Sequence, residues 1–314
     1  HDTVLWDGTG SAKTISGFEF SPDLIICNGR QTNYDLPVID TVRGANRTLF
    51  TFTSRASEST SSNYVTGFTS DGFTVGSDTA LNENNKEQMA WCWSAGDSNA
   101  TNTSGSITST VRANTTAGFS IVSYTGNGTT NSTIGHGLGA KPAWMIVKNR
   151  SDNYAHWQIY HHRMIADTNY NAAGHATQWN EPNGWHETDN YWKRVMPTSS
   201  VFTVGSHEDV NRNNHNYIAY CWAEIEGYSR FGIYKGNGQS DEKPFIYTGF
   251  RPAWLLVKST GGSPANNGWY IYDNKRDNFG TLVDVQLYAN YSSADDSGNR
   301  DLDFLSNGFK PRLT

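Results

Sequence analysis

The residues best suited to bind a ligand lie in one tryptophan-rich segment, HATQWNEPNGWHETDNYW at residues 175–192. Indole rings stack on the apolar face of a sugar, and amide or carboxylate groups form hydrogen bonds with its hydroxyls. Surface loops also carry function more often than strands do. The candidates for contact with a glycan are Trp179, Trp185, Trp192, Tyr191, Asn183 and Glu187. The alternative is that these side chains are buried in the fold or at a contact between subunits.

Histidines are concentrated in the middle of the chain, where seven of the nine lie between His156 and His215. A transition-metal site needs three or four convergent ligands at matched spacing. The spacings here are irregular and no cysteine accompanies them. We therefore expect scattered histidines and no metal centre or other cofactor.

One pair of carboxylates has the spacing of a hydrolytic site. Glu224 and Glu226 would lie on the same face of a strand, and a glycoside hydrolase uses two carboxylates that face one groove. The pair is not accompanied by a nucleophile elbow, a zinc-protease motif or a phosphate loop. We therefore expect a protein without enzymatic activity, with a polysaccharide hydrolase as the alternative.

The segment DDSGNRDLD, residues 295–303, holds four aspartates. Calcium prefers oxygen-rich loops with a glycine turn. The spacing does not match an EF-hand, so a solvated acidic loop is the preferred interpretation. Asp295, Asp296 and Asp301 are only weak calcium candidates.

The composition indicates an all-β protein. Aromatic residues make up 13% of the 314 residues, and Ser, Thr, Asn and Gly are abundant, a mixture of strand formers and turn formers. The net charge is −6 and no run of Lys and Arg is longer than two, which argues against a nucleic-acid groove. Apolar runs are too short for insertion into a membrane.

The chain repeats itself. The matching segments are KPAWMIVK (141–148) and RPAWLLVK (251–258), SYTGNG (123–128) and IYKGNG (233–238), FTVGS (73–77 and 202–206), and AWCW (90–93) and AYCW (219–222). SPDLIICN at residues 21–28 is the first copy of the octapeptide. A period of this length is that of a whole domain and exceeds the periods of solenoids and propellers. We therefore expect three domains arrayed like beads.

Each octapeptide predicts a central strand. In the second copy, Ala143, Met145 and Val147 fall on one face, whereas Trp144 and Ile146 fall on the other, by the two-residue period of a strand. Both faces are apolar, so both should be covered. We therefore predict tandem antiparallel β-sandwiches of a jelly-roll or lectin-like type.

The three cysteines do not form a disulfide framework. Cys92 and Cys221 lie in matching AWCW and AYCW contexts, so with Cys27 they are expected as buried free thiols. In the AWCW strand, small Ala90 and Cys92 share one face, which favours close approach of a second sheet. The two tryptophans would cover the opposite side.

The repeats set the expected domain boundaries. The third copy has SNGF at residues 306–309, which matches SDGF at 70–73, but no AWCW-like strand follows. We expect that the natural chain continues; the alternative is that a strand from elsewhere completes that sheet. The expected divisions are 1–96 for the first copy, 97–117 for a Ser/Thr/Asn-rich linker or edge strand, 118–228 for the second copy, and 229–314 for the incomplete third copy.

The landmarks of the first copy resemble a repeated module of undetermined function in marine bacteriophage tail-fibre and other virion proteins. The matching segments are FSPDLIICN (20–28), DTVRGA (40–45), SDGFTVGSD (70–78) and AWCW (90–93). The second copy departs from the pattern, with HHRMI where the first has TVRGA. The resemblance implies a virion surface or tail-fibre component that is oligomeric, and it brings no catalytic residues.

The expected function is a non-catalytic virion structural protein, a tail-fibre or surface-decoration module whose loops contact host envelope glycans. Its expected partners are copies of itself, as a trimer or other homo-oligomer, other virion proteins and host surface polysaccharide, at the virion surface or outside the cell. The alternatives are a secreted polysaccharide-acting hydrolase, a carbohydrate-binding protein on a lectin-like sandwich, and a spacer without a ligand.

Overall fold

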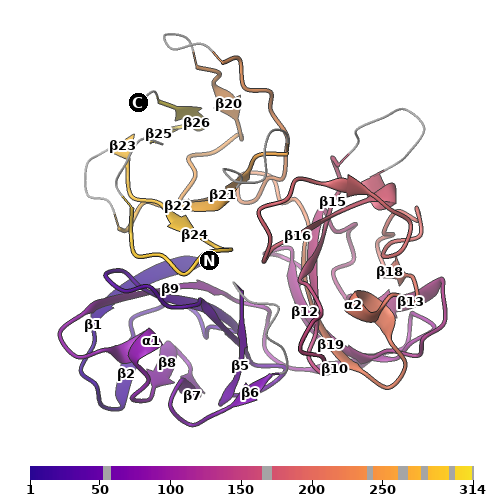
Figure 1. Cartoon of the computed structure of the whole chain (residues 1–314), viewed down its shortest axis with the longest axis horizontal. Helices are drawn as coiled ribbons and strands as arrows, with labels where there is room; N and C mark the ends of the chain where they lie inside the picture. The colour runs from indigo at the N-terminus through magenta and orange to yellow at the C-terminus, as the bar shows by residue number, and fades with distance from the viewer. Residues whose placement is uncertain are drawn as a thin grey trace.

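Figure 1 shows the computed structural model of the chain, which describes residues 1–51, 58–164, 172–238, 243–260, 268–276, 282–296 and 301–312. Within these ranges nearly all regular structure is β-strand in several antiparallel sheets. The helices are single turns: α1 Thr79–Asn82, α2 Glu208–Asn211 and the 3-10 helix η1 Ala172–Gly174. The expected all-β class is confirmed. None of the helices in the described ranges has the length and apolarity that a membrane crossing requires.

The first repeat contains two antiparallel sheets, a larger one with the order β1-β9-β3-β4-β5-β6 and a smaller one with the order β2-β8-β7. Its strands are β1 Asp2–Asp7, β2 Lys13–Ser16, β3 Leu24–Gly29, β4 Pro37–Asp40, β5 Arg47–Phe50, β6 Ser59–Thr60, β7 Val65–Thr69, β8 Gly72–Val75 and β9 Glu87–Trp93. The AWCW strand β9 lies between β1 and β3 and pairs with both.

The second repeat has the larger sheet β10-β11-β12-β19-β14-β15-β16-β17 and the smaller sheet β13-β18. Its strands are β10 Ala100–Asn102, β11 Ser109–Asn114, β12 Phe119–Thr125, β13 Ser132–Gly135, β14 Trp144–Asn149, β15 Gln158–His161, β16 His175–Gln178, β17 His186–Glu187, β18 Val201–Val204 and β19 Asn216–Trp222. The segment 97–117 supplies β10 and β11, which extend the edge of the larger sheet.

The third repeat has the sheets β21-β22-β24 and β20-β26-β25-β23. Its strands are β20 Ile246–Tyr247, β21 Trp254–Lys258, β22 Trp269–Asp273, β23 Leu282–Val283, β24 Leu287–Tyr288, β25 Leu302–Leu305 and β26 Gly308–Pro311. The octapeptide strand β21 corresponds to β3 and β14, because Trp254 pairs opposite Asp273 as Leu24 pairs opposite Asp40.

The predicted faces of the repeated strands are confirmed. In β14, Met145 and Val147 lie in a cluster with Phe202 and Val204 of the smaller sheet, whereas Ile146 points to a different cluster. Equivalent clusters between larger and smaller sheets occur in the first and third repeats. The small face of the AWCW strand therefore lies against the smaller sheet, as the sequence predicts.

The three thiols are free and buried, as expected. They lie on two strand types, with Cys27 on β3 and Cys92 and Cys221 on β9 and β19. Burial raises the pKa of Cys221 to about 12, which disfavours the reactive thiolate. These cysteines therefore serve as small apolar side chains.

The second faces of the three larger sheets meet in one hydrophobic cluster at the centre of the molecule, which Figure 1 shows as three lobes around a shared middle. Trp91, Trp222 and Trp269 are contributed by the first, second and third repeats. The Trp93 ring lies 6.2 Å from that of Trp222 and 5.4 Å from that of Trp254. The expected bead-like array is therefore wrong, because both faces of each larger sheet are apolar and the second face is covered by the other repeats.

Glycine is required where the smaller sheets turn tightly. A Cβ atom at Gly72 would lie 1.9 Å from the carbonyl oxygen of Ile15, and one at Gly308 would lie 2.1 Å from that of Ile246. A β-carbon cannot approach a backbone oxygen so closely. The SDGF and SNGF segments therefore keep glycine because a neighbouring strand passes close to its α-carbon.

Candidate functional site

Three of the six glycan candidates are buried. Trp179 is 2% exposed, Trp192 is 1% exposed and Tyr191 is 6% exposed. Trp179 belongs to the central cluster and packs edge-on against Trp157, with the ring centroids 5.6 Å apart. Side chains in such positions cannot stack on a sugar at the surface. The expectation of glycan contact is therefore corrected for these three residues, which cover apolar surface inside the fold.

The other three candidates remain at the surface. Trp185 is half-buried, whereas Asn183 and Glu187 are exposed. The Trp185 ring lies 5.7 Å from the ring of buried His175, which supports the indole from one side. We call Trp185, Asn183 and Glu187 the Trp185 patch. Its apolar ring beside an amide and a carboxylate is the part of the tryptophan-rich segment 175–192 that could contact a ligand.

The tryptophan-rich segment is held against the third repeat. Lys258 Nζ donates a hydrogen bond to the carbonyl oxygen of Pro182 at 2.6 Å, and Trp269 Nε1 donates to that of Gln178 at 3.0 Å. Burial lowers the pKa of Lys258 to about 8. The Trp185 patch therefore rests on a loop that is anchored at two points.

The histidines of the second repeat contact different neighbours. His162 Nε2 lies 2.9 Å from the carbonyl oxygen of Phe231, and His156 Nδ1 lies 2.9 Å from Nδ2 of Asn180. Within the described ranges, no group of three or more His, Cys, Asp or Glu side chains is placed to hold a metal ion.

His136 is held in one neutral form, which makes it acid-sensitive. Its Nδ1 accepts a hydrogen bond from the Leu138 N–H at 3.2 Å, so Nε2 carries the proton, 3.2 Å from the Thr198 carbonyl oxygen. Burial lowers the pKa of His136 to about 4, below the value of about 6.5 in an unfolded chain.

Because the unfolded chain binds this proton more tightly, His136 lowers stability as the pH falls from about 6.5 towards 4. Asparagine at this position keeps an acceptor but does not titrate. We expect His136→Asn to remove up to about 3 kcal/mol of the acid-induced loss of unfolding free energy. Urea unfolding at several pH values would measure it, and an acid slope equal to that of the wild type would contradict the assignment.

The glutamate pair lies in a turn and not on a strand, which corrects the expected placement of the two carboxylates on one strand face. Glu224 and Glu226 lie in the turn that joins the second and third repeats, and Glu224 Oε1 accepts a hydrogen bond from the Phe231 N–H at 3.1 Å. Glu224 thus ties down the chain beyond the turn. This arrangement gives the hydrolase alternative no support.

The acidic segment 295–303 uses three of its four aspartate side chains in internal contacts, and its residues 297–300 lie outside the described ranges. Asp303 forms an ion pair with Arg312 Nε at 2.7 Å. Asp295 forms ion pairs with Arg30 Nε at 2.6 Å and Arg276 Nη1 at 2.9 Å. Asp296 accepts from Gln286 Nε2 at 2.9 Å. The calcium expectation is corrected for Asp295, because two guanidinium groups already neutralise its charge. The carbonyl oxygen of Asp301 accepts a hydrogen bond from the Arg312 N–H.

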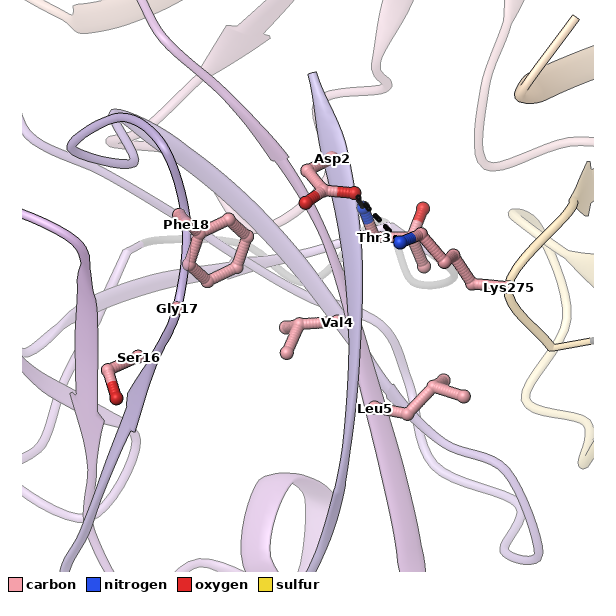
Figure 2. Close-up of a pocket in the computed structure, with 8 residues that line it drawn as sticks. All are labelled: Asp2, Thr3, Val4, Leu5, Ser16, Gly17, Phe18 and Lys275. Carbon is pink, nitrogen blue, oxygen red and sulfur yellow. Dashed lines mark hydrogen bonds and ion pairs between the residues drawn. The ribbon is translucent and has the colours of Figure 1, made fainter.

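An open hollow lies between β1, the segment Ser16–Phe18 and the third repeat (Figure 2). Its apolar wall includes Val4, and its charged groups are Asp2 and Lys275, whose Oδ1 and Nζ atoms are 3.8 Å apart. Figure 2 shows these two groups pointing toward one another at one end of the hollow. The two charged groups that line the hollow are therefore paired with each other.

The closest charged groups are buried where repeats meet. Arg43 Nε lies 2.5 Å from Asp40 Oδ2, and neither side chain is exposed. The same Asp40 oxygen accepts from the Tyr220 hydroxyl of the second repeat at 2.7 Å. Burial raises the pKa of Tyr220 well above its usual value; the Asp40 carboxylate adds to this rise, and Arg43 opposes it. The pair is sealed by protein and therefore locks the first repeat to the second.

The third repeat has the same device toward the first. Arg276 Nε lies 2.6 Å from Asp273 Oδ2, and that oxygen also accepts from Trp91 Nε1 at 3.0 Å. Burial alone would raise the pKa of Asp273, but Arg276 holds it below its usual range. Trp91 and Tyr220 occupy the same position in the AWCW and AYCW strands. The DTVR (40–43) and DNKR (273–276) segments thus each provide a buried ion pair that binds a side chain of another repeat.

A second set of ion pairs joins one repeat to another in an equivalent way. Arg150 of the second repeat reaches Glu58 of the first at 2.8 Å, and Arg30 of the first reaches Asp295 of the third at 2.6 Å. Arg30 and Arg150 are both the sixth residue after the matching Leu24 and Trp144. Neither these links nor the two buried pairs were among the expectations from the sequence. The recurrence of Asp-x-x-Arg in the first and third repeats was a signal for the buried pairs Asp40–Arg43 and Asp273–Arg276.

One family model matches the chain. The family is described as Domain of unknown function (DUF7483), and the match spans residues 1–314, which includes all three repeats. No curated protein and no solved structure matches the chain.

Proposed function

The chain belongs to the family described as Domain of unknown function (DUF7483), and we propose that it is a non-catalytic structural module of a virion, in a tail fibre or surface decoration. The observation that carries the proposal is the use of its charged side chains. Asp40 with Arg43 and Asp273 with Arg276 are buried pairs that join repeats. Groups committed in this way stiffen a particle and are shielded from any substrate. The likeness of the repeated motifs to tail-fibre modules supports the same function.

We propose that each repeat is an antiparallel β-sandwich of a jelly-roll or lectin-like type. The larger and smaller sheets of each repeat share one hydrophobic cluster, which supports this division. The proposed divisions are 1–96, 97–228 and 229–314. The segment 97–117, expected as a linker or edge strand before a copy at 118–228, is assigned to the second sandwich because β10 and β11 pair within its larger sheet. A stiff unit of three lobes suits a fibre or a decoration that assembles into a homo-oligomer.

The Trp185 patch is the proposed contact with host envelope glycan. Trp185 is half-buried against His175, which fixes the ring without hiding it. Exposed Asn183 and Glu187 supply an amide and a carboxylate for hydroxyl groups. The loop is anchored by Lys258, so little entropy is lost when the patch binds.

Affinity electrophoresis through gels cast with host envelope polysaccharide tests this function. We expect retardation of the intact chain, with the polymer left uncut. Trp185→Ala should weaken binding about tenfold, since a contact of about 1.4 kcal/mol corresponds to that factor. The matched control is Tyr154→Ala, because Tyr154 is an 81% exposed aromatic residue on the same repeat.

The outcomes separate the functions. Shortening of the polymer would contradict the non-catalytic assignment and favour the hydrolase. Unretarded migration of the wild type would leave a structural module without a glycan ligand. Equal retardation of Trp185→Ala and wild type would place the contact elsewhere on the chain.

A further inference from the structure

Among the described residues of the third repeat, one strand position that the other two repeats fill is open. β3 pairs with β4 and β9, and β14 pairs with β15 and β19. The equivalent β21 pairs with β22, and within the described part of the chain no strand pairs with its other edge. Every residue of β3 and β14 is buried, whereas every residue of β21 is only partly buried.

The segment that would flank the missing strand on the side opposite β21 is also present. In the first two repeats β1 and β12 flank the AWCW-type strand, and the matching segment of the third repeat is residues 229–235, which lead into the shared GNG motif. This segment sits over the smaller sheet through the same ring pair as its counterparts. The edge-on pairs are Trp6–Phe73 at 5.9 Å, Tyr124–Phe202 at 6.2 Å and Tyr234–Phe309 at 5.9 Å.

The exposure of this segment indicates that a neighbour belongs beside it. Trp6 and Tyr124 are 8% and 3% exposed, but Tyr234, at the same position, is 42% exposed and the adjacent Ile233 is 60% exposed. Tyr234 keeps its ring partner, so the segment is not displaced. What differs is the strand that covers its counterparts in the other two repeats.

We propose that the slot between β21 and residues 229–235 accepts one antiparallel strand of the β9 and β19 type, an extended peptide that alternates small and aromatic residues. Sheet edges bind extended peptides through main-chain hydrogen bonds, with alternate side chains giving specificity. The slot would close the larger sheet of the third repeat as β9 and β19 close the other two.

The register of the incoming strand follows from the two filled positions. Ala90 pairs opposite Cys27 and Ala219 opposite Val147, so a small residue is expected opposite Val257. Val257 and Leu255 are partly buried against the cluster of the third repeat, whereas Trp254 and Leu256 border the central cluster. The small residues should therefore face the smaller sheet and the aromatic residues the centre.

The aromatic residue opposite Leu256 would make the contact between the third and second repeats that matches the contacts at the other two junctions. At the other two junctions the residue in this position, Tyr220 or Trp91, donates to an aspartate. The position equivalent to that aspartate in the second repeat is His161, which pairs opposite Trp144. The ring resonances of His161 therefore report on occupation of the slot.

A peptide with the β19 sequence NYIAYCW, flanked by lysines for solubility and labelled with a dye, tests the proposal on the intact chain. We expect saturable binding by fluorescence anisotropy under reducing conditions. Hydrogen exchange should slow in β21 and in residues 229–235, and the His161 ring resonances should shift.

The matched control is the peptide NYIYAWC, in which the small and aromatic residues exchange faces. A one-residue change of face should weaken binding about tenfold. Absence of binding, equal affinity for the two peptides, or protection at β1 or β10 in place of β21 would each overturn the proposal. None of these readouts depends on glycan binding, so the experiment tests the strand proposal independently of the proposed function.

Discussion

Replacing Arg43 with methionine is expected to lower the free energy of unfolding by about 3–5 kcal/mol, because a buried carboxylate is left without its counter-ion. Arg43 Nε lies 2.5 Å from Asp40, and its Nη2 donates to the carbonyl oxygen of Val38 at 2.8 Å. Methionine fills a similar volume, so the loss is electrostatic and not a matter of packing. Chemical denaturation followed by tryptophan fluorescence measures the change.

The matched control is Arg47→Met. Arg47 pairs with Glu58 at 2.7 Å but its side chain is 47% exposed, and exposed pairs contribute about 1 kcal/mol or less. Asp40→Leu combined with Arg43→Met should recover much of the stability, since removing both buried charges is often close to neutral. A loss below about 1 kcal/mol in Arg43→Met would show that water reaches Asp40.

Local strand chemistry was predictable because it follows from neighbours in the sequence. The two-residue period placed Met145 and Ile146 on opposite faces, and the matched contexts of Cys92 and Cys221 predicted buried thiols; both expectations are confirmed. The recurrence of the octapeptide predicted that these strands are central. In β3 and β14 this holds on both edges.

The packing of the three repeats against one another was not predictable in the same way. An apolar second face predicts that a strand is buried on that side, but it does not say which segment covers it. Separate domains, each covering its own strands, would have produced the same sequence pattern. The cover is provided by the other repeats, through contacts such as Trp157 Nε1 to the Phe50 carbonyl oxygen at 2.9 Å. Residues more than 100 positions apart meet there, which no local period encodes.

The candidate site was predicted only in part. The tryptophans of the segment 175–192 were candidates because indoles stack on sugars, yet composition cannot distinguish an exposed indole from one that fills a core. Trp179 and Trp192 are used for packing, whereas Trp185 remains accessible. Asp295 likewise had the chemistry of a calcium ligand, but it is neutralised by Arg30 from a distant repeat.

Truncating Trp222 to alanine is expected to lower the free energy of unfolding by about 3–5 kcal/mol, the range for a buried tryptophan. The Trp222 ring lies 4.7 Å from Trp144 and 4.8 Å from Phe119 within its own repeat, and 6.2 Å from Trp93 of the first repeat. The cavity would open in the central cluster, where the apolar faces of all three larger sheets depend on one another. Urea unfolding measures the loss, with Trp185→Ala as a control at a half-buried indole, for which about 1 kcal/mol or less is expected.

The same variant distinguishes a shared core from independent domains. If the repeats were independent, Trp222→Ala would speed hydrogen exchange in β14 and β19 and leave β3 and β9 unchanged. Because Trp93 lies between Trp222 and Trp254, with ring distances of 6.2 and 5.4 Å, we expect exchange to speed up in all three larger sheets together. Cooperative loss of this kind is the behaviour of one folding unit.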